Sequence, residues 1–274
     1  MERFFMKRLF IIQLTANFTV LFLFGLLNIQ GFAQMIENRT SEVKSTIQSD
    51  KKTFVLLELF TSEGCPTCPP ADANLAFLER EQPFANTEVV TLALHVDYWN
   101  SITWKDIYSS PLYSRRQQLY SQALKINQSY TPQMIVDGQI EFTGNNMAKA
   151  QKAILDALKT PKATIEITKT TDKLTVNVSD VPPHEIATVF LAVTEDDLPS
   201  NRKYGVAAER KAAHQSVVRE LKSIGMLPVG QLKLEIETVV QIQPEWKREN
   251  LKLVVFVQEN ASRRILGVAR RNLN

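Results

Sequence analysis

The chain has 274 residues, of which 44% are hydrophobic and 22% are charged, as in ordinary globular proteins. This length accommodates one large domain or two modest domains. The formal net charge is +3, and residues 1–33 contribute +2 of it. The remainder therefore has too little excess charge to indicate a nucleic-acid surface, and we expect no nucleic-acid partner.

Residues 1–33 have the features of an export signal. Basic residues precede an apolar stretch at 9–27, and Gly31-Phe32-Ala33 offers small residues at the positions that signal peptidase reads. We expect cleavage after Ala33 and export to the periplasm or the medium. The alternative is an uncleaved N-terminal anchor, because the apolar stretch is nearly long enough to span a bilayer. Residues 34–52 are polar without an apolar period, which predicts a flexible lead-in.

A strand, a cysteine pair and a helix follow in direct succession. The apolar run Phe54–Phe60 predicts a buried strand. Cys65 and Cys68, the only two cysteines, come next, and Pro69 and Pro70 suit the first turn of a helix. A helix N-terminus stabilises a thiolate, and a second cysteine can resolve a mixed disulfide. The pattern therefore favours thiol–disulfide chemistry, with Cys65 as the attacking thiolate because it is nearer the loop.

Two structural interpretations compete with redox chemistry. The cysteine pair can be a static disulfide that closes a tight loop, or half of a metal site. Zinc usually requires four ligands, and His95, His184 and His214 are scattered along the chain, so we predict no metal site. A weaker alternative is a copper-handling protein that uses Cys65, Cys68 and His95, because soft thiolates suit Cu(I).

The second predicted strand, Val89–Val96, ends in polar and aromatic residues. Because the carboxyl ends of parallel strands meet at one edge of a sheet, we expect His95 and Asp97 to approach the cysteines. A histidine there can stabilise a thiolate or transfer protons. The alternative is a structural His–Asp pair. We expect Trp99 and Trp104 to cover the cysteines.

Residues 101–128 predict a helical insertion. Arg115 and Arg116 form a basic face, which can bind an acidic partner but is more typical of a solvated surface. Further along, Thr131-Pro132 precedes a predicted strand at Met134–Val136.

The chain then turns and closes its first half. Asp137-Gly138 predicts a hairpin turn, with Ile140–Thr143 as the return strand. Met147–Leu158 has apolar residues at helical spacing, and Pro161 marks the boundary between a domain at 53–160 and a second domain at 161–274.

The second half has the alternating texture of an antiparallel β-sandwich. Its apolar runs are expected to be strands, at Ala163–Thr168, Leu174–Val178, Ala187–Val193, Leu232–Val239, Leu251–Val257 and Ile265–Ala269. Residues 209–221 fit a strand or a short helix, and His214 within them fits a polar loop or an edge. This half shows no catalytic motif, so we expect a binding or stabilising module.

Three motifs together resemble a known family. They are LELFTSEGCPTCPPAD, then HVDYW at His95–Trp99, then YTPQMIVDG at Tyr130–Gly138. They resemble the bacterial secreted family called domain of unknown function 1223, and the strand–CxxC–helix unit looks like the thioredoxin superfamily. The resemblance runs from about Phe54 almost to the C-terminus. It implies a thioredoxin-like α/β domain with a helical insertion, followed by a β-rich domain.

The resemblance also implies roles for single residues. Glu58 resembles a buried acid that assists proton transfer to the second cysteine, although it is seven residues before Cys65; the alternative is a salt-bridged acid. Pro132 matches a cis-proline beside the CxxC, and Thr131 then offers backbone bonds to a substrate peptide, with Trp99 and Asp97 as further groove residues; the alternative is a trans turn proline. Thioredoxins carry a tryptophan before the first cysteine, and this chain has Gly64 there.

The sequence therefore favours an exported thiol–disulfide oxidoreductase that acts on protein or small-molecule thiols and disulfides. It would need no soluble cofactor, because the cysteine pair is the redox centre, and another redox protein or a small thiol would reset it. The alternative is a non-catalytic thioredoxin-like binding module with a structural disulfide. Substrate, direction of electron flow and oligomeric state do not follow from the residues.

Overall fold

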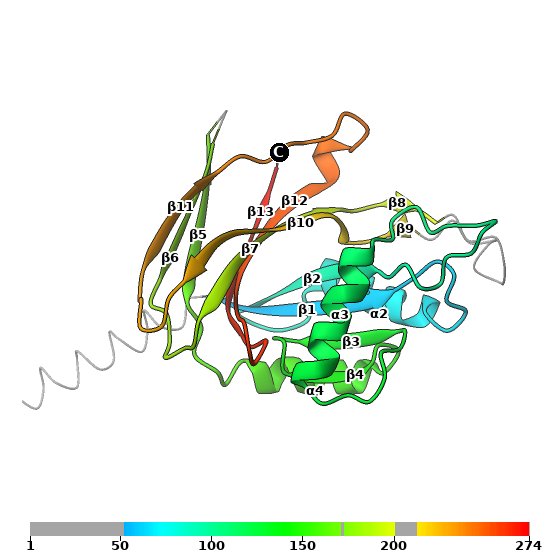
Figure 1. Ribbon diagram of the computed structural model, residues 1–274, viewed down its shortest axis with the longest axis horizontal. Coiled ribbons are helices and arrows are strands. Elements are labelled where there is room, and N and C mark those ends of the chain that lie inside the picture. Colours follow the sequence, from blue (N-terminus) through cyan, green and yellow to red (C-terminus); the bar gives the residue numbers. More distant parts are fainter. Residues whose placement is uncertain (1–51, 171–172, 201–212, 274) are drawn as a thin grey trace, which may run out of the picture. The chain divides into compact units, whose positions relative to one another are not determined.

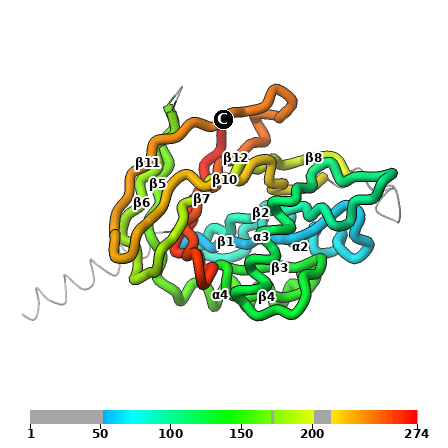
Figure 2. The backbone as a smooth tube through the Cα atoms, in the orientation of Figure 1, coloured from blue at the N-terminus to red at the C-terminus, as the bar shows by residue number. Residues whose placement is uncertain are grey.

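The structure, a computed structural model, describes residues 52–170, 173–200 and 213–273 (Figures 1 and 2). The predicted export signal and all but one residue of the lead-in lie outside these ranges. In chain order the described elements are β1 (Thr53–Thr61), α2 (Pro69–Glu81), β2 (Thr87–His95), α3 (Pro111–Ala123), β3 (Gln133–Val136), β4 (Ile140–Thr143), α4 (Met147–Ala157), β5 (Thr164–Lys169), β6 (Leu174–Ser179), β7 (Ala187–Glu195), β8 (Leu198–Pro199), β9 (Ala213–His214), β10 (Val217–Leu227), β11 (Leu234–Thr238), a 3-10 turn (Arg248–Asn250), β12 (Leu251–Glu259) and β13 (Ile265–Asn272). Within them no helix has both the length and the apolar character needed to cross a membrane.

The protein is mixed α/β and rich in strands, with three α-helices in the described ranges and one large central sheet. Eight strands form this sheet in the order β13-β12-β7-β10-β2-β1-β3-β4. β1 runs parallel to β2 and antiparallel to β3. β10 continues the sheet from β2 in parallel, with Val217 opposite Ala93, and pairs antiparallel with β7. The sheet thus takes strands from both sides of Pro161, the predicted domain boundary.

Both faces of β1 are buried, which explains its nearly continuous apolar sequence. Leu57 and Leu59 pack against α2 and α4. Leu56 and Phe60 point to the other face, where they pack with side chains of α3. Alternation along a strand assigns each residue to one of these two cores.

A second, three-stranded sheet, β11-β6-β5, packs on β7, β12 and β13. Its apolar residues, such as Val176 and Ile236, share one core with Leu191 and Val255 of the large sheet. The contact is close at Gly225 of β10, where an added Cβ would lie 2.6 Å from Cδ1 of Ile236. Two packed sheets in this half agree with the predicted strands after Pro161.

The main differences from the predicted elements lie in two segments. The predicted helical insertion at 101–128 contains a helix only at Pro111–Ala123, and Ser110 caps it by accepting from the Leu112 N–H. The ambiguous segment at 209–221, where it is described, holds β9 and the start of β10. β10 has few alternating apolar residues, and its bulges at Val218–Glu220 and Ser223–Gly225 interrupt the period that would have predicted it.

A buried ion pair joins α3 to the central sheet. The Arg116 guanidinium donates to both carboxylate oxygens of Glu58, at 2.6 and 3.0 Å, and also to Gln258 at 3.0 Å. The Tyr120 hydroxyl donates to the same carboxylate. Burial alone would lower the pKa of Arg116, but Glu58 outweighs it and raises that pKa. The prediction that Arg116 is solvated is wrong, because its side chain is only 8% exposed.

Replacing Arg116 by Met should destabilise the fold by roughly 3–5 kcal/mol, because it leaves the Glu58 carboxylate buried without its cation. The measurement is urea unfolding. Arg115→Met is the matched control: Arg115 is the exposed neighbour on the same helix, and its replacement should change the unfolding free energy by less than about 0.5 kcal/mol. Equal effects of the two replacements would contradict a special role for the ion pair.

Candidate functional site

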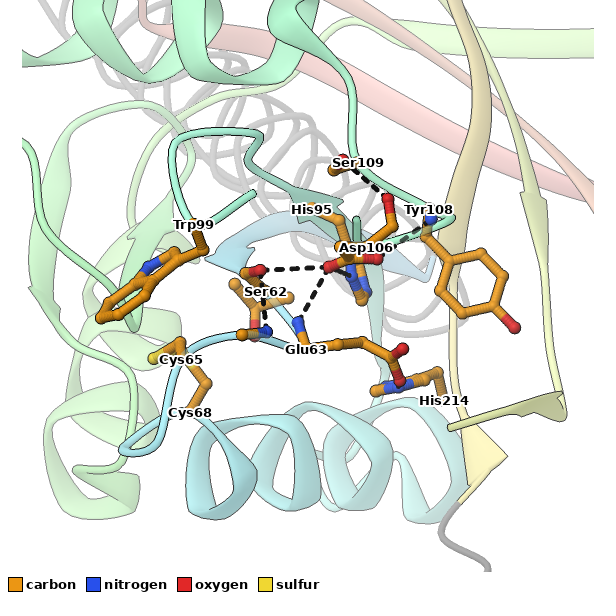
Figure 3. Close-up of polar contacts among 12 residues, drawn as sticks. Ser62, Glu63, Cys65, Cys68, His95, Trp99, Asp106, Tyr108, Ser109 and His214 are labelled. Atoms are coloured by element: carbon orange, nitrogen blue, oxygen red, sulfur yellow. Dashed lines mark hydrogen bonds and ion pairs between the residues drawn. A yellow bond between two sulfur atoms is a disulfide. The ribbon is translucent and has the colours of Figure 1, made fainter. Parts of the chain in front are cut away.

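The two cysteines form a disulfide at the start of α2 (Figure 3). β1 ends at Thr61, a short loop follows, and Cys68 is the N-cap residue of the helix. The Cys68 carbonyl accepts from the N–H groups of Ala71 and Asp72. The predicted succession of strand, loop, CxxC and helix is therefore confirmed. Both cysteines are covered, since Cys65 is 1% exposed and Cys68 is fully buried.

The loop before Cys65 is held by one carboxylate. Asp106 Oδ2 accepts from the Glu63 N–H at 2.8 Å and from the Ser62 hydroxyl at 3.1 Å. Ser62 in turn binds the next two residues of the loop, because its Oγ accepts from the Gly64 N–H and its carbonyl accepts from the Cys65 N–H. Ser62 thus links the Asp106 carboxylate to the backbone of Cys65.

The same carboxylate binds His95. The His95 Nδ1 lies 2.8 Å from Asp106 Oδ2, and both side chains are fully buried. Burial raises the pKa of Asp106, but the His95 hydrogen bond and charge, with the N–H donors of Glu63 and Tyr108, outweigh it and lower that pKa to about 2. Asp106 therefore stays ionised at neutral pH. Since a carboxylate only accepts, Nδ1 of His95 carries the proton.

A second histidine–carboxylate pair lies next to the first. The His214 Nε2 is 2.8 Å from Glu63 Oε1, with both side chains buried. The rings of His95 and His214 are 5.2 Å apart in an edge-to-face arrangement, and Tyr108 packs against both. The other ring nitrogen of His95, Nε2, is buried and has no hydrogen-bond partner among the described residues. Figure 3 shows this cluster beside the loop that leads to the disulfide.

Two tryptophans pack against Gly64. A Cβ there would lie 2.9 Å from Cζ3 of Trp104 and 3.0 Å from Cβ of Trp99, closer than side-chain atoms normally pack. A side chain at the position before Cys65 would therefore require one of these tryptophans to shift. Trp99 Nε1 donates to Thr131 Oγ1 at 2.8 Å. The indole of Trp99 therefore connects the loop after β2 to the residue before Pro132.

The Thr131–Pro132 peptide is cis, as the resemblance implied. Its position is close to the helix that carries the cysteines. A Cβ on Gly144 would lie 3.0 Å from Cβ of Ala71, in the first turn of α2, and 3.6 Å from Cβ of Pro132. Gly144 therefore lies next to both Pro132 and the first turn of α2.

The other predicted site residues have partners on α3. Glu58 points to the α3 face of β1, the face opposite Leu57 and Leu59, and is held by Arg116. Its contacts are those of the salt-bridged alternative. Asp97 bonds the Ser114 hydroxyl, so the carboxylate that pairs with His95 is Asp106 and not Asp97.

Sequence reasoning missed Asp106, Glu63 and His214 as members of the site. Asp106 lies in a loop with no periodic pattern, 11 residues after His95. His214 is 151 residues from Glu63; it lies at a sheet edge, in the two-residue strand β9 that pairs only with β8 among the described strands, but its side chain is buried. The sequence offers one signal for such a pair, an acid close to a histidine along the chain. Several acids lie close to His95 in the sequence, so this signal does not single out its partner.

Metal binding was the other chemistry considered for these residues. In the ranges that the structure describes, no group of three or more His, Cys, Asp or Glu residues has the arrangement to hold a metal ion. The sulfurs are bonded to each other, and the ring of His95 is bonded to Asp106.

The chain is similar to proteins of known structure. A crystal structure of a protein from Agrobacterium tumefaciens aligns with a TM-score of 0.67 and 25% identity, over 81% of this chain and 96% of that one. HBP35 of Porphyromonas gingivalis shares the fold, with a TM-score of 0.55 and 18% identity over 81% and 76% of the two chains. No curated protein matches. Residues 56–258 match the model of the family described as protein of unknown function (DUF1223), and the chain therefore belongs to the DUF1223 family.

Proposed function

We propose that this protein is an exported thiol–disulfide oxidoreductase whose redox centre is the Cys65–Cys68 pair. The observation that carries the proposal is the disulfide itself, formed between loop and helix at the N-terminus of α2. Free N–H groups and the positive end of the helix dipole favour a thiolate at that position. The proposed substrates are protein or small-molecule thiols and disulfides.

A thioredoxin-like unit is the second part of the proposal. It comprises β1, α2, β2, α3, β3, β4 and α4, with the strands in the order β2-β1-β3-β4. Support comes from this strand order and from the closeness of Pro132 to the start of α2. Within the segment 101–128, which was expected to be a helical insertion, α3 is in this proposal the helix that crosses between β2 and β3, and the inserted part is the segment before α3.

The proposed exchange proceeds in two balanced steps. The reduced Cys65 thiolate attacks a substrate disulfide, forms a mixed disulfide and releases one substrate thiolate. Cys68 then attacks Cys65, the substrate leaves as its second thiolate, and the Cys65–Cys68 disulfide is restored. A dithiol partner or a small thiol reverses this sequence and resets the pair. Thr131, Pro132, Trp99 and Asp97 remain proposed groove residues.

Burial favours a second candidate function. Because Cys65 is 1% exposed, a substrate reaches its sulfur only after neighbouring side chains move. A static disulfide in a non-catalytic binding module needs no such movement. The reduction potential distinguishes the two candidates, since structural disulfides lie below about −300 mV and exchange-competent pairs lie between roughly −120 and −270 mV.

We expect the protein without the predicted export signal, equilibrated against glutathione and dithiothreitol, to have a reduction potential of the Cys65–Cys68 pair in the exchange-competent range of roughly −120 to −270 mV. The measurement is thiol trapping followed by mass spectrometry. A potential well below about −300 mV with slow reduction would support the static disulfide and reject the enzyme.

The two cysteines should differ in reactivity. With Cys68→Ser, Cys65 should attack glutathione disulfide and accumulate as a stable glutathione adduct, because the resolving thiol is gone. With Cys65→Ser as the matched control, Cys68 should form the adduct at least about tenfold more slowly, because it is enclosed at the N-cap of α2. Mass spectrometry of the intact protein measures both rates. Equal rates would show that the order of attack is wrong.

A further inference from the structure

Reduction of the disulfide creates a charge problem that the surrounding residues must solve. A thiolate at Cys65 or Cys68 would form in a covered position, where water contributes little to its stabilisation. Two carboxylates, Asp106 and Glu63, already lie in or next to the loop before Cys65. Like charges raise the pKa of a thiol, so these carboxylates oppose the thiolate unless a cation balances them.

Several charged groups that pack near the cluster in the described ranges pair with one another. Arg219 of β10 lies 3.5 Å from Glu195 of β7 and over the ring of Tyr108. From α2, Asp72 bonds Thr61, the register partner of His95, and Glu79 bonds Thr91 on the same face of β2. The cations Lys252 and Arg270 face Glu79.

The two histidines of the cluster can supply a new positive charge. His95 and His214 each bond one of the two carboxylates, and the Nε2 of His95 is free to take up a proton. Histidine changes its charge in the pH range in which a protein works. Tyr108, which packs on both rings, has its pKa raised to about 12, first by burial and then by the Glu63 carboxylate.

We propose that His95 and His214, held by Asp106 and Glu63, provide the positive charge that stabilises the thiolate formed when the Cys65–Cys68 disulfide is reduced. The contacts of both rings run to the carboxylates, so the histidines are positioning residues that act on the sulfurs through the electrostatic field and the Ser62–Gly64 loop.

The step balances in atoms and charge. A dithiol reductant gives two electrons and two protons and becomes a cyclic disulfide. The electrons break the Cys65–Cys68 bond; one proton goes to Cys68, which becomes a thiol, and the other goes to a histidine. The reduced protein then holds a Cys65 thiolate and an imidazolium, and reoxidation returns both protons. The inference rests on the proposed function in one respect, that the disulfide can be reduced.

The test measures thiolate in the reduced protein. The full chain is reduced with dithiothreitol, its thiols are counted, and the ultraviolet absorbance of thiolate is followed against pH. His95→Gln and His214→Gln keep a donor for each carboxylate but cannot take a positive charge. Each should raise the pH at which the thiolate appears, with an acid dissociation constant at least about tenfold smaller than in the unchanged protein.

His184→Gln is the matched control. His184 is also nearly buried, but its ring nitrogens lie near the backbone carbonyls of Glu185 and Gln231, outside the cluster of His95 and His214. It should leave the thiolate profile unchanged. Thermal unfolding of each variant checks that it is folded.

The possible outcomes separate the two proposals. A disulfide that resists reduction overturns both the function and this inference. A reducible pair whose thiolate appears only near the ordinary thiol pKa of about 8.5 overturns this inference alone, without use of any variant. So does a low midpoint that both His95→Gln and His214→Gln leave unchanged, because the helix dipole would then suffice. A shift in the two variants but not in His184→Gln supports the inference.

Discussion

A buried carboxylate needs donors on every side, and Asp106 obtains them from three parts of the chain. The His95 ring, the Ser62 hydroxyl and the backbone N–H groups of Glu63 and Tyr108 all donate to it. The path of the loop before Cys65 delivers two of these donors to the carboxylate. The site depends on this constraint, since an ionised carboxylate without them would be costly to bury.

The β-rich half contributes to the site through the sheet. β10 pairs with β2, and this pairing brings β9 with His214 to the Glu63 carboxylate. The half that carries no catalytic motif thus supplies one of the two histidines of the cluster. Some of its strands belong to the same hydrogen-bonded sheet as the cysteine-bearing half. The two halves are therefore joined by backbone hydrogen bonds of the sheet and by side-chain contacts such as that of His214 with Glu63.

Enclosure of the disulfide sets the chemistry that is open to it. Gly64 admits two tryptophans against the loop, and both cysteines are covered. Low exposure limits exchange with bulky substrates and raises the cost of any charge formed on sulfur. An exchange enzyme built this way needs both a movement that uncovers Cys65 and a cation that stabilises its thiolate.

The sequence by itself predicted the local units, the cysteine pair and the place of His95 near it. The strand–CxxC–helix succession, the hairpin after Pro132 and the strands of the second half other than β10 follow from periods of 2 and 3.6 and from turn residues, which act over a few positions. Only the tertiary structure decided which strands pair, that Arg116 is buried against Glu58, and that Asp106 and His214 join His95. Backbone hydrogen bonds between strands are nearly independent of side-chain identity, so a single sequence carries little information about which distant strands pair. The polar side chains that this pairing brings together leave no periodic signal in the sequence.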